Sequence, residues 1–122
     1  MKVLLGIVSD DRYSQALEET IERARVAGDD LTVALVDDPG ASMDADAVGG
    51  AIEETLADAS IDADVRYIDG DPGSRLVEIA ETEGFDRIVL SGGQTSPMGK
   101  IRIGTTVEFV LLNSHTSVTL IR

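Results

Sequence analysis

The stretch from Ser91 to Thr106 contains the residues of this chain whose types and spacing best suit ligand chemistry. It reads SGGQTSPMGKIRIGTT and precedes an apolar-periodic run from Val107 to Leu112. Glycine lets backbone N–H groups approach an anion closely, and the first turn of a following helix has donors without partners inside the helix. The pattern therefore predicts a cradle for a phosphate group or a nucleotide.

Other residue types give little evidence of catalysis. The one histidine, His115, has neither a cysteine nor a second histidine with which to form a metal site, so we expect it on the surface. No serine has the Gly-x-Ser-x-Gly surroundings of a hydrolase nucleophile, including Ser9, Ser91 and Ser96. We therefore expect no dedicated catalytic residue.

Adjacent acids form the one candidate for a Mg²⁺ site. Carboxylates are suitable ligands for this ion, and two pairs follow apolar runs, Asp10 with Asp11 and Asp37 with Asp38. In a chain this acidic, a solvated surface is the simpler explanation for all of them except Asp10. We expect no metal site built by the protein alone.

Composition excludes several classes of partner. There are 23 acids against 10 bases, a formal net charge of −13, and Lys occurs only at Lys2 and Lys100. Such a surface repels nucleic acids and anionic membranes, which are bound through Lys and Arg. The acid excess and scarcity of Lys suit a halophilic cell, where salt screens self-repulsion. A halophilic archaeal source is our hypothesis about habitat.

Length and hydropathy predict one soluble domain. A chain of 122 residues is too short for two cores, so the expected domain comprises residues 1–122. No apolar run approaches the roughly 20 residues that span a bilayer, and the first residues meet acids too soon for a signal peptide. We expect a cytoplasmic protein that has no disulfide, because the chain has no cysteine.

Strands and helices alternate around the glycine-rich stretch. Apolar runs typical of strands lie at Lys2–Val8, Leu31–Val36, Ala63–Ile68, Arg87–Leu90 and Ser117–Ile121. Apolar residues at helical spacing predict helices from Tyr13 to Gly28, from about Ala45 to Ala59, from Pro72 to Gly84 and from Val107 to Leu112. Short connections between such elements favour an open parallel sheet with helices on both faces, an α/β fold of the Rossmann-like kind. In such sheets, ligands bind beyond the carboxyl ends of the strands.

Two helix starts have recognisable capping residues. Asp71 is expected to cap the helix that has Pro72 at its first position. Thr105 and Glu108 have the spacing of a capping box at the start of the last helix. The capping box gives Thr105 a structural explanation beside a ligand-binding one.

Several of these residues resemble the universal stress protein domain. The resemblance depends on Asp10 after the first strand, on GDPGSRLVEIAETEGFDRIVL (70–90) and on GKIRIGTTVEFVLLNSHTSVTLIR (99–122), and it covers nearly the whole chain. It implies the strand order 3-2-1-4-5 of the adenine nucleotide alpha hydrolase-like fold and a homodimer. It also implies a regulatory protein that binds ATP with Mg²⁺ and at most hydrolyses it slowly.

The resemblance also implies a set of binding residues. In nucleotide-binding members the loop reads Gly, two residues, Gly, nine residues, then Gly followed by Ser or Thr. Counting back from Gly104 places the two earlier glycines of this pattern at Ser91 and Gln94, so neither position has glycine in this chain. Gly92 and Gly93 lie between these two positions. Adenosine is expected beside Asp10 and the backbone near Val36, and the ribose and phosphates beside Gly92, Gly93, Ser96, Gly99, Lys100, Gly104, Thr105 and Thr106.

Two alternatives remain. A protein of the same fold could bind no nucleotide and act as a dimeric interaction module, paired through the last strand, Val118 to Ile121, which is an exposed sheet edge unless it has a partner. The sequence SGGQTS (91–96) also resembles the SGGxDS loop of ATP pyrophosphatases, which adenylate a substrate. That loop belongs after the first strand with an Asp where Thr95 stands, whereas here it follows the fourth.

Overall fold

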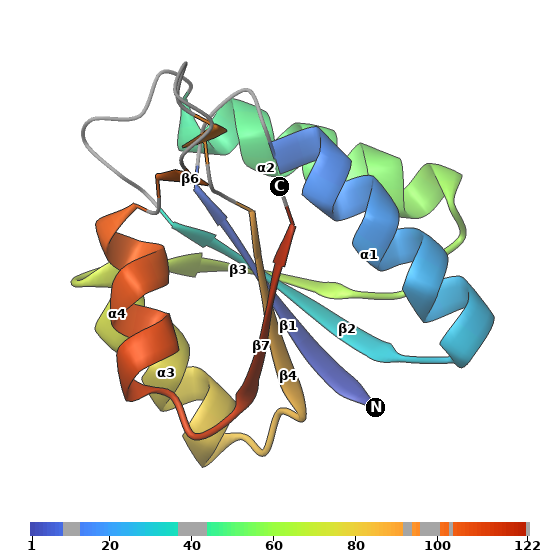
Figure 1. Cartoon of the computed structure of the whole chain (residues 1–122). Coiled ribbons are helices and arrows are strands. Elements are labelled where there is room, and N and C mark those ends of the chain that lie inside the picture. Colours follow the sequence, from blue (N-terminus) through green and yellow to red (C-terminus); the bar gives the residue numbers. More distant parts are fainter. Residues whose placement is uncertain (9–12, 37–43, 92–93, 96–100, 103, 122) are drawn as a thin grey trace.

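Figure 1 shows the computed structural model of the chain, which describes residues 1–8, 13–36, 44–91, 94–95, 101–102 and 104–121. The strands in these ranges are β1 (Lys2–Val8), β2 (Asp30–Val36), β3 (Asp64–Ile68), β4 (Arg87–Ser91), β5 (Gln94–Thr95), β6 (Ile101–Arg102) and β7 (Ser117–Ile121). The helices are α1 (Tyr13–Ala27), α2 (Ala45–Asp58), α3 (Pro72–Thr82) and α4 (Thr105–Asn113). The expected alternation of strands and helices is therefore confirmed.

Five parallel strands form the central sheet in the order β3-β2-β1-β4-β7. This is the predicted order 3-2-1-4-5, with β7 as the fifth strand. At the centre of the sheet, Gly6 pairs with Ala34 on one side and with Leu90 on the other. The chain moves outward from β1 to β3 and then returns to the other side of β1, so the strand order reverses between β1 and β4.

Each face of the sheet is covered by two helices (Figure 1). On one face, Leu5 of β1 belongs to a buried cluster with Leu17 of α1 and Ile52 of α2. On the other face, Leu4 packs with residues of α3 and α4, among them Leu76 and Val110. Neighbouring residues of β1 thus point into different cores, which explains why this strand is apolar throughout instead of alternating.

The start of α3 and the ends of α1 and α3 follow the expected chemistry. Asp71 accepts a hydrogen bond from the backbone N–H of Ser74 at 3.1 Å, and Pro72 is the first residue of α3. Gly28 and Gly84 follow α1 and α3 with φ of 73° and 70°. These left-handed conformations favour glycine, so both residues act as helix stops.

A glycine that looks unfavourable in the sequence has a packing explanation. Gly49 lies inside α2, where glycine costs about 1 kcal/mol relative to alanine. It is buried, and a Cβ added there would collide with the Tyr67 hydroxyl on β3, whereas one added at Gly50 would meet nothing within 4 Å. The first glycine therefore makes room for Tyr67 where α2 packs against β3.

The glycine-rich stretch contains a short hairpin that the sequence does not predict. Gln94 pairs with Arg102 and Thr95 with Ile101 in an antiparallel ladder of two residues a strand. Strands this short have no hydrophobic period, so nothing in the residue pattern indicates them. The expectation of one continuous loop from Ser91 to Thr106 is corrected to this extent.

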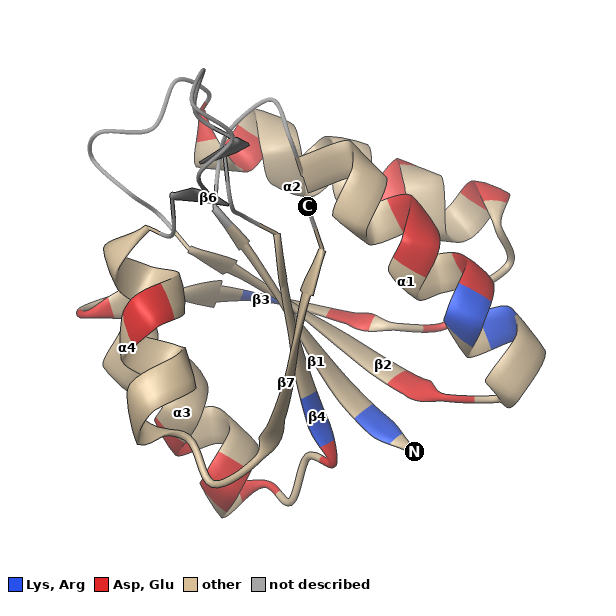
Figure 2. Ribbon diagram, in the orientation of Figure 1, with Lys and Arg blue, Asp and Glu red and all other residues tan. Residues whose placement is uncertain are grey.

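Acidic residues are spread over both helical layers, whereas basic residues are few (Figure 2). Most of the described basic side chains belong to β1, β3, β4 and the C-terminal half of α1. None of the helices in the described ranges has the length and hydropathy that crossing a membrane requires.

Candidate functional site

The carboxyl edge of the sheet is where the topology would place a ligand. β1, β2 and β4 end there at Val8, Val36 and Ser91, and the strand order reverses between β1 and β4. Helices α3 and α4 both begin at this edge, side by side (Figure 1). In open α/β sheets, a crevice at such a reversal is the usual ligand site.

The start of α4 has a different cap from the predicted one. Gly104 is the N-cap, with φ −68° and ψ 162°, and Thr105 is the first helical residue. The first backbone hydrogen bond of the helix runs from Glu108 N–H to the Gly104 carbonyl, and no side chain caps the turn. The predicted capping box with Thr105 as N-cap is therefore wrong, because the helix begins one residue earlier than that box requires.

This correction changes what the start of α4 offers to a ligand. Within the described part of the chain, no side chain accepts a hydrogen bond from the N–H groups of Thr105, Thr106 or Val107. Such groups carry the positive end of the helix dipole and attract anions. Gly104 itself has a negative φ and open space around its Cα, so the fold does not require glycine at this position.

A depression of about 360 Å³ lies between the starts of α3 and α4. Thr105, Thr106 and Phe109 line it from α4, and Asp71, Pro72 and Gly73 from the start of α3. Gly73 allows the two helices to approach, since a Cβ there would lie 2.8 Å from the Phe109 ring. The close contact between α3 and α4 beside the depression therefore depends on the absence of a side chain at Gly73.

Asp71 introduces a negative charge beside this depression. Its pKa is lowered by hydrogen bonds from Ser74, first from the side chain and then from the backbone. The carboxylate thus remains ionised to lower pH than an ordinary aspartate while it caps α3. An anionic ligand at the start of α4 would lie near this charge, which favours binding with an accompanying cation.

The predicted binding residues fall into two groups. Val36, Gly104, Thr105 and Thr106 are described, and all four lie at the carboxyl edge, Val36 as the buried last residue of β2. The remaining ones lie outside the described residues: Asp10, Gly92, Gly93, Ser96, Gly99 and Lys100.

Other sequence-level candidates are divided in the same way. The acids proposed as Mg²⁺ ligands, 10–11 and 37–38, lie outside the described residues. Among the described ones, no group of three or more His, Asp or Glu side chains is arranged to hold a metal ion. His115 is exposed just before β7, as expected. The SGGQTS stretch begins at Ser91, the last residue of β4, so it does not follow the first strand.

Sequence reasoning missed how α3 packs against α4 at this site. Pro72, Gly73 and Phe109 line the depression, yet the sequence indicated only a helix start and a core helix. The pairing of Gly73 with Phe109 depends on how α3 and α4 pack, and no local pattern carries that information.

Solved structures of similar fold include several universal stress proteins. One from Archaeoglobus fulgidus has a TM-score of 0.78 at 20% identity, with 100% of this chain and 98% of that chain covered. A universal stress protein from Archaeoglobus fulgidus in complex with dAMP has a TM-score of 0.74 at 18% identity, covering 100% and 98%. A universal stress protein in complex with cAMP has a TM-score of 0.77 at 22% identity, covering 100% and 96%. At these identities the likeness shows the fold alone.

Sequence comparison identifies the family independently of the fold. No curated protein sequence matches the chain at a significant level. The model of the universal stress protein family, in contrast, matches residues 1–122, which is the whole sequence. The chain therefore belongs to the universal stress protein family.

Proposed function

We propose that this universal stress protein domain binds an adenine nucleotide at the carboxyl edge of its sheet and acts as a regulator without dedicated catalysis. The observation that carries the proposal is the start of α4, where Gly104 leaves the first turn without a side-chain cap. The two complexes with dAMP and cAMP among proteins of this fold support the choice of an adenine nucleotide.

In the proposed arrangement, the phosphates of the ligand bind at the start of α4. The N–H groups of Thr105 and Thr106 would donate to phosphate oxygens, and Asp10 with the backbone near Val36 would lie beside adenosine. Gly92, Gly93, Ser96, Gly99 and Lys100 would complete the cradle, with Lys100 supplying a cation. ATP is the proposed ligand with Mg²⁺, which would offset repulsion between the phosphates, Asp71 and a chain of net charge −13.

Substitution of Gly104 provides a sharp test. Asp and Asn are nearly equal in shape and are both preferred N-cap residues, so either should preserve or improve α4. Asp, however, places a negative charge where the phosphates would lie. We expect equilibrium titration with Mg-ATP at high salt to show that Gly104→Asn weakens binding modestly and Gly104→Asp weakens it at least about tenfold more, since 1.4 kcal/mol is a factor of ten.

Several outcomes would contradict this proposal. Absence of binding to wild-type protein at millimolar ATP, ADP, AMP and cAMP would reject it outright. Equal affinities for the Asp and Asn variants would mean that the phosphates do not contact the start of α4.

Lys100→Ala is expected to weaken ATP binding more than AMP binding if Lys100 contacts the terminal phosphates. An equal loss of affinity for ATP and AMP would remove Lys100 from the site.

A homodimer is the second element of the proposal. β7 pairs with β4 alone among the described strands, so its other edge presents backbone donors and acceptors without strand partners there. Its residues from Val118 to Ile121 are all half-buried, and Leu112 of the preceding helix is 76% exposed. Edge strands of this kind invite pairing with a second chain.

The mass in solution tests the dimer. We expect twice the 12.9 kDa of one chain for the wild type and a single-chain mass after truncation following Ser117. Circular dichroism must show that the truncated protein keeps its helices. A folded truncated protein that stays dimeric would refute pairing through β7 and favour another surface.

A further inference from the structure

A second cavity lies away from the proposed nucleotide site, on the α1 face of the sheet. It has a volume of about 270 Å³ and lies between α1 and the β4–β7 side of the sheet. Its lining residues Val3, Leu31 and Arg87 belong to the amino-terminal ends of their strands. Because the strands are parallel, this is the opposite end of the sheet from Gly104 and Thr105.

Arg87 gives this cavity its chemistry. Its Nε is buried and has no hydrogen-bond partner in the described structure. Besides Arg87, the structure describes five Lys and Arg side chains, Arg102 not being among them, and each of the five has a partner. The carboxylate-paired ones are Arg23, Arg25, Arg66 and Arg75, and Lys2 donates to the Glu83 carbonyl. A buried donor without an acceptor is costly, so the position calls for an anion or another acceptor.

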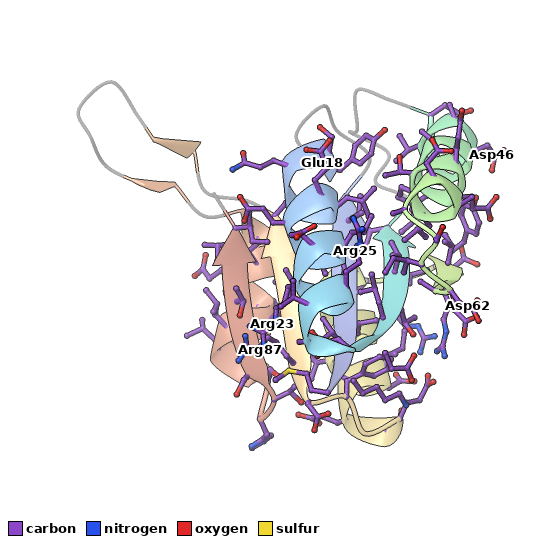
Figure 3. All side chains as sticks on the ribbon, turned by 90° about the vertical axis from the view of Figure 1, so that its right-hand side faces the viewer. Glu18, Arg23, Arg25, Asp46, Asp62 and Arg87 are labelled. Atoms are coloured by element: carbon purple, nitrogen blue, oxygen red, sulfur yellow. The ribbon has the colours of Figure 1, made fainter. Side chains whose placement is uncertain are left out.

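Arg23 also lines the cavity, and it forms an ion pair with Asp29. Figure 3 shows both arginines between α1 and the β4–β7 side, and both line the cavity. Arg23 Nε lies 3.3 Å from a carboxylate oxygen of Asp29, whose side chain is only 3% exposed. The charge of Asp29 is therefore compensated by Arg23 together with the N-terminal ammonium of Met1, which lies 3.1 Å from the other carboxylate oxygen. Arg87 is thus the arginine of the cavity that has no carboxylate partner in the described structure.

The rest of the cavity is suited to an apolar group. Val3, Leu31 and Val89 form its buried floor, and Ile121 of β7 borders it. Its volume is just below the roughly 300–1,000 Å³ of typical small-molecule pockets, so the occupant is smaller than a nucleotide. An apolar floor with one cationic donor on its wall matches a short amphipathic anion.

We infer that this cavity binds a small monocarboxylate with an aliphatic body, whose carboxylate accepts hydrogen bonds from the Arg87 guanidinium. The planar fork of arginine matches the two oxygens of a carboxylate. A phosphate is disfavoured, because Glu19 also lines the cavity and a second negative charge on the ligand would increase the repulsion from this carboxylate. The site would give this chain a second ligand, separate from the proposed nucleotide.

Three probes with the same body and different head groups test the inference. Hexanoate, hexanol and hexylammonium would be titrated into the ¹⁵N-labelled full chain at high salt, and amide shifts followed by NMR. We expect hexanoate to shift amides of β4, β7 and the C-terminal half of α1, with hexanol weaker and hexylammonium weakest. Equal affinity for the three would overturn carboxylate recognition, and no shift at millimolar hexanoate would overturn the site.

Variants connect the binding to Arg87. Arg87→Gln should lower hexanoate affinity at least about tenfold, as expected for a lost charge-assisted hydrogen bond, and Arg87→Lys should lower it less. Arg75→Gln is the matched control, because Arg75 pairs with Glu78 on α3 away from the cavity. Unchanged binding in Arg87→Gln would refute the assignment.

A second approach keeps the inference testable if the Arg87 variants fold poorly. Thr119→Phe fills the cavity from the half-buried edge strand while Arg87 remains intact, and it should abolish hexanoate binding. Retained binding would contradict the location. If hexanoate has no effect and Arg87→Gln instead dissociates a dimer, a second copy of the chain covers this surface and the inference is wrong.

Discussion

At the scale of single residues, Gly104 illustrates how a cap can be misjudged. A Thr–Glu pair three apart is a common helix signature, and here it indicated Thr105 as the cap. Gly104 is the N-cap instead, and Thr105 is the first residue of the helix. The difference is one residue, yet it decides whether the first N–H groups of α4 are occupied by a side chain or open to an anion.

The two glycines of α2 make a prediction at the same scale. We expect Gly50→Ala to raise the free energy of unfolding by about 1 kcal/mol, because Gly50 is exposed and a Cβ there has free space. Gly49→Ala should raise the free energy of unfolding by less, or lower it, since the added Cβ would displace the Tyr67 hydroxyl. Urea unfolding of both variants measures the difference.

Removal of the Tyr67 side chain provides the control for these two variants. With Tyr67→Ala in the background, Gly49→Ala should recover most of the gain of Gly50→Ala, so the two changes would be non-additive. Equal stabilisation by both glycine substitutions in the wild type would mean that Tyr67, which is 53% exposed, moves aside without cost.

At the scale of elements, the sequence predicted most of the fold. β1 and β7 begin and end where the apolar runs indicated, whereas β2 begins one residue earlier and β4 extends to Ser91. Stop residues such as Gly28 and Gly84 marked helix ends because their left-handed backbone favours glycine. These features are local, so a residue pattern alone can encode them.

Contacts between elements were beyond that reasoning. Glu83, just after α3, forms two hydrogen bonds of 2.6 and 2.7 Å with Arg66 of β3. The pair lowers the pKa of Glu83 and raises the pKa of Arg66, in each case mainly through these bonds. Nothing in the spacing of two residues 17 positions apart announces such a pairing, just as nothing announced Gly73 opposite Phe109.

At the scale of the whole molecule, charge has a consequence for stability. A net charge of −13 makes the folded chain repel itself, and salt shortens the range of that repulsion. We expect the thermal midpoint to rise between about 0.1 M and about 1 M KCl, as the Debye length falls from roughly 10 Å to roughly 3 Å. Thermal unfolding followed by circular dichroism measures this rise.

A less charged variant separates screening from general salt effects. Glu53→Gln with Glu54→Gln removes two exposed charges from α2 and should reduce the dependence on KCl. If the thermal midpoint rose equally with KCl concentration in this variant and in the wild type, the salt effect would not arise from self-repulsion. A midpoint independent of KCl would remove the physical basis for inferring a halophilic source.

The sequence by itself determined the alternation of strands and helices, the apolar strands of a sheet covered on both faces and the residues that begin and end α3. These depend on periodicity and backbone preference, which act over a few residues. Tertiary structure alone decided that the start of α4 has no side-chain cap, that Gly73 lies against Phe109 beside the depression and that Arg87 Nε is buried without a hydrogen-bond partner in the described structure. Each of these depends on groups far apart in the chain, and only the packed sheet and helices bring them together.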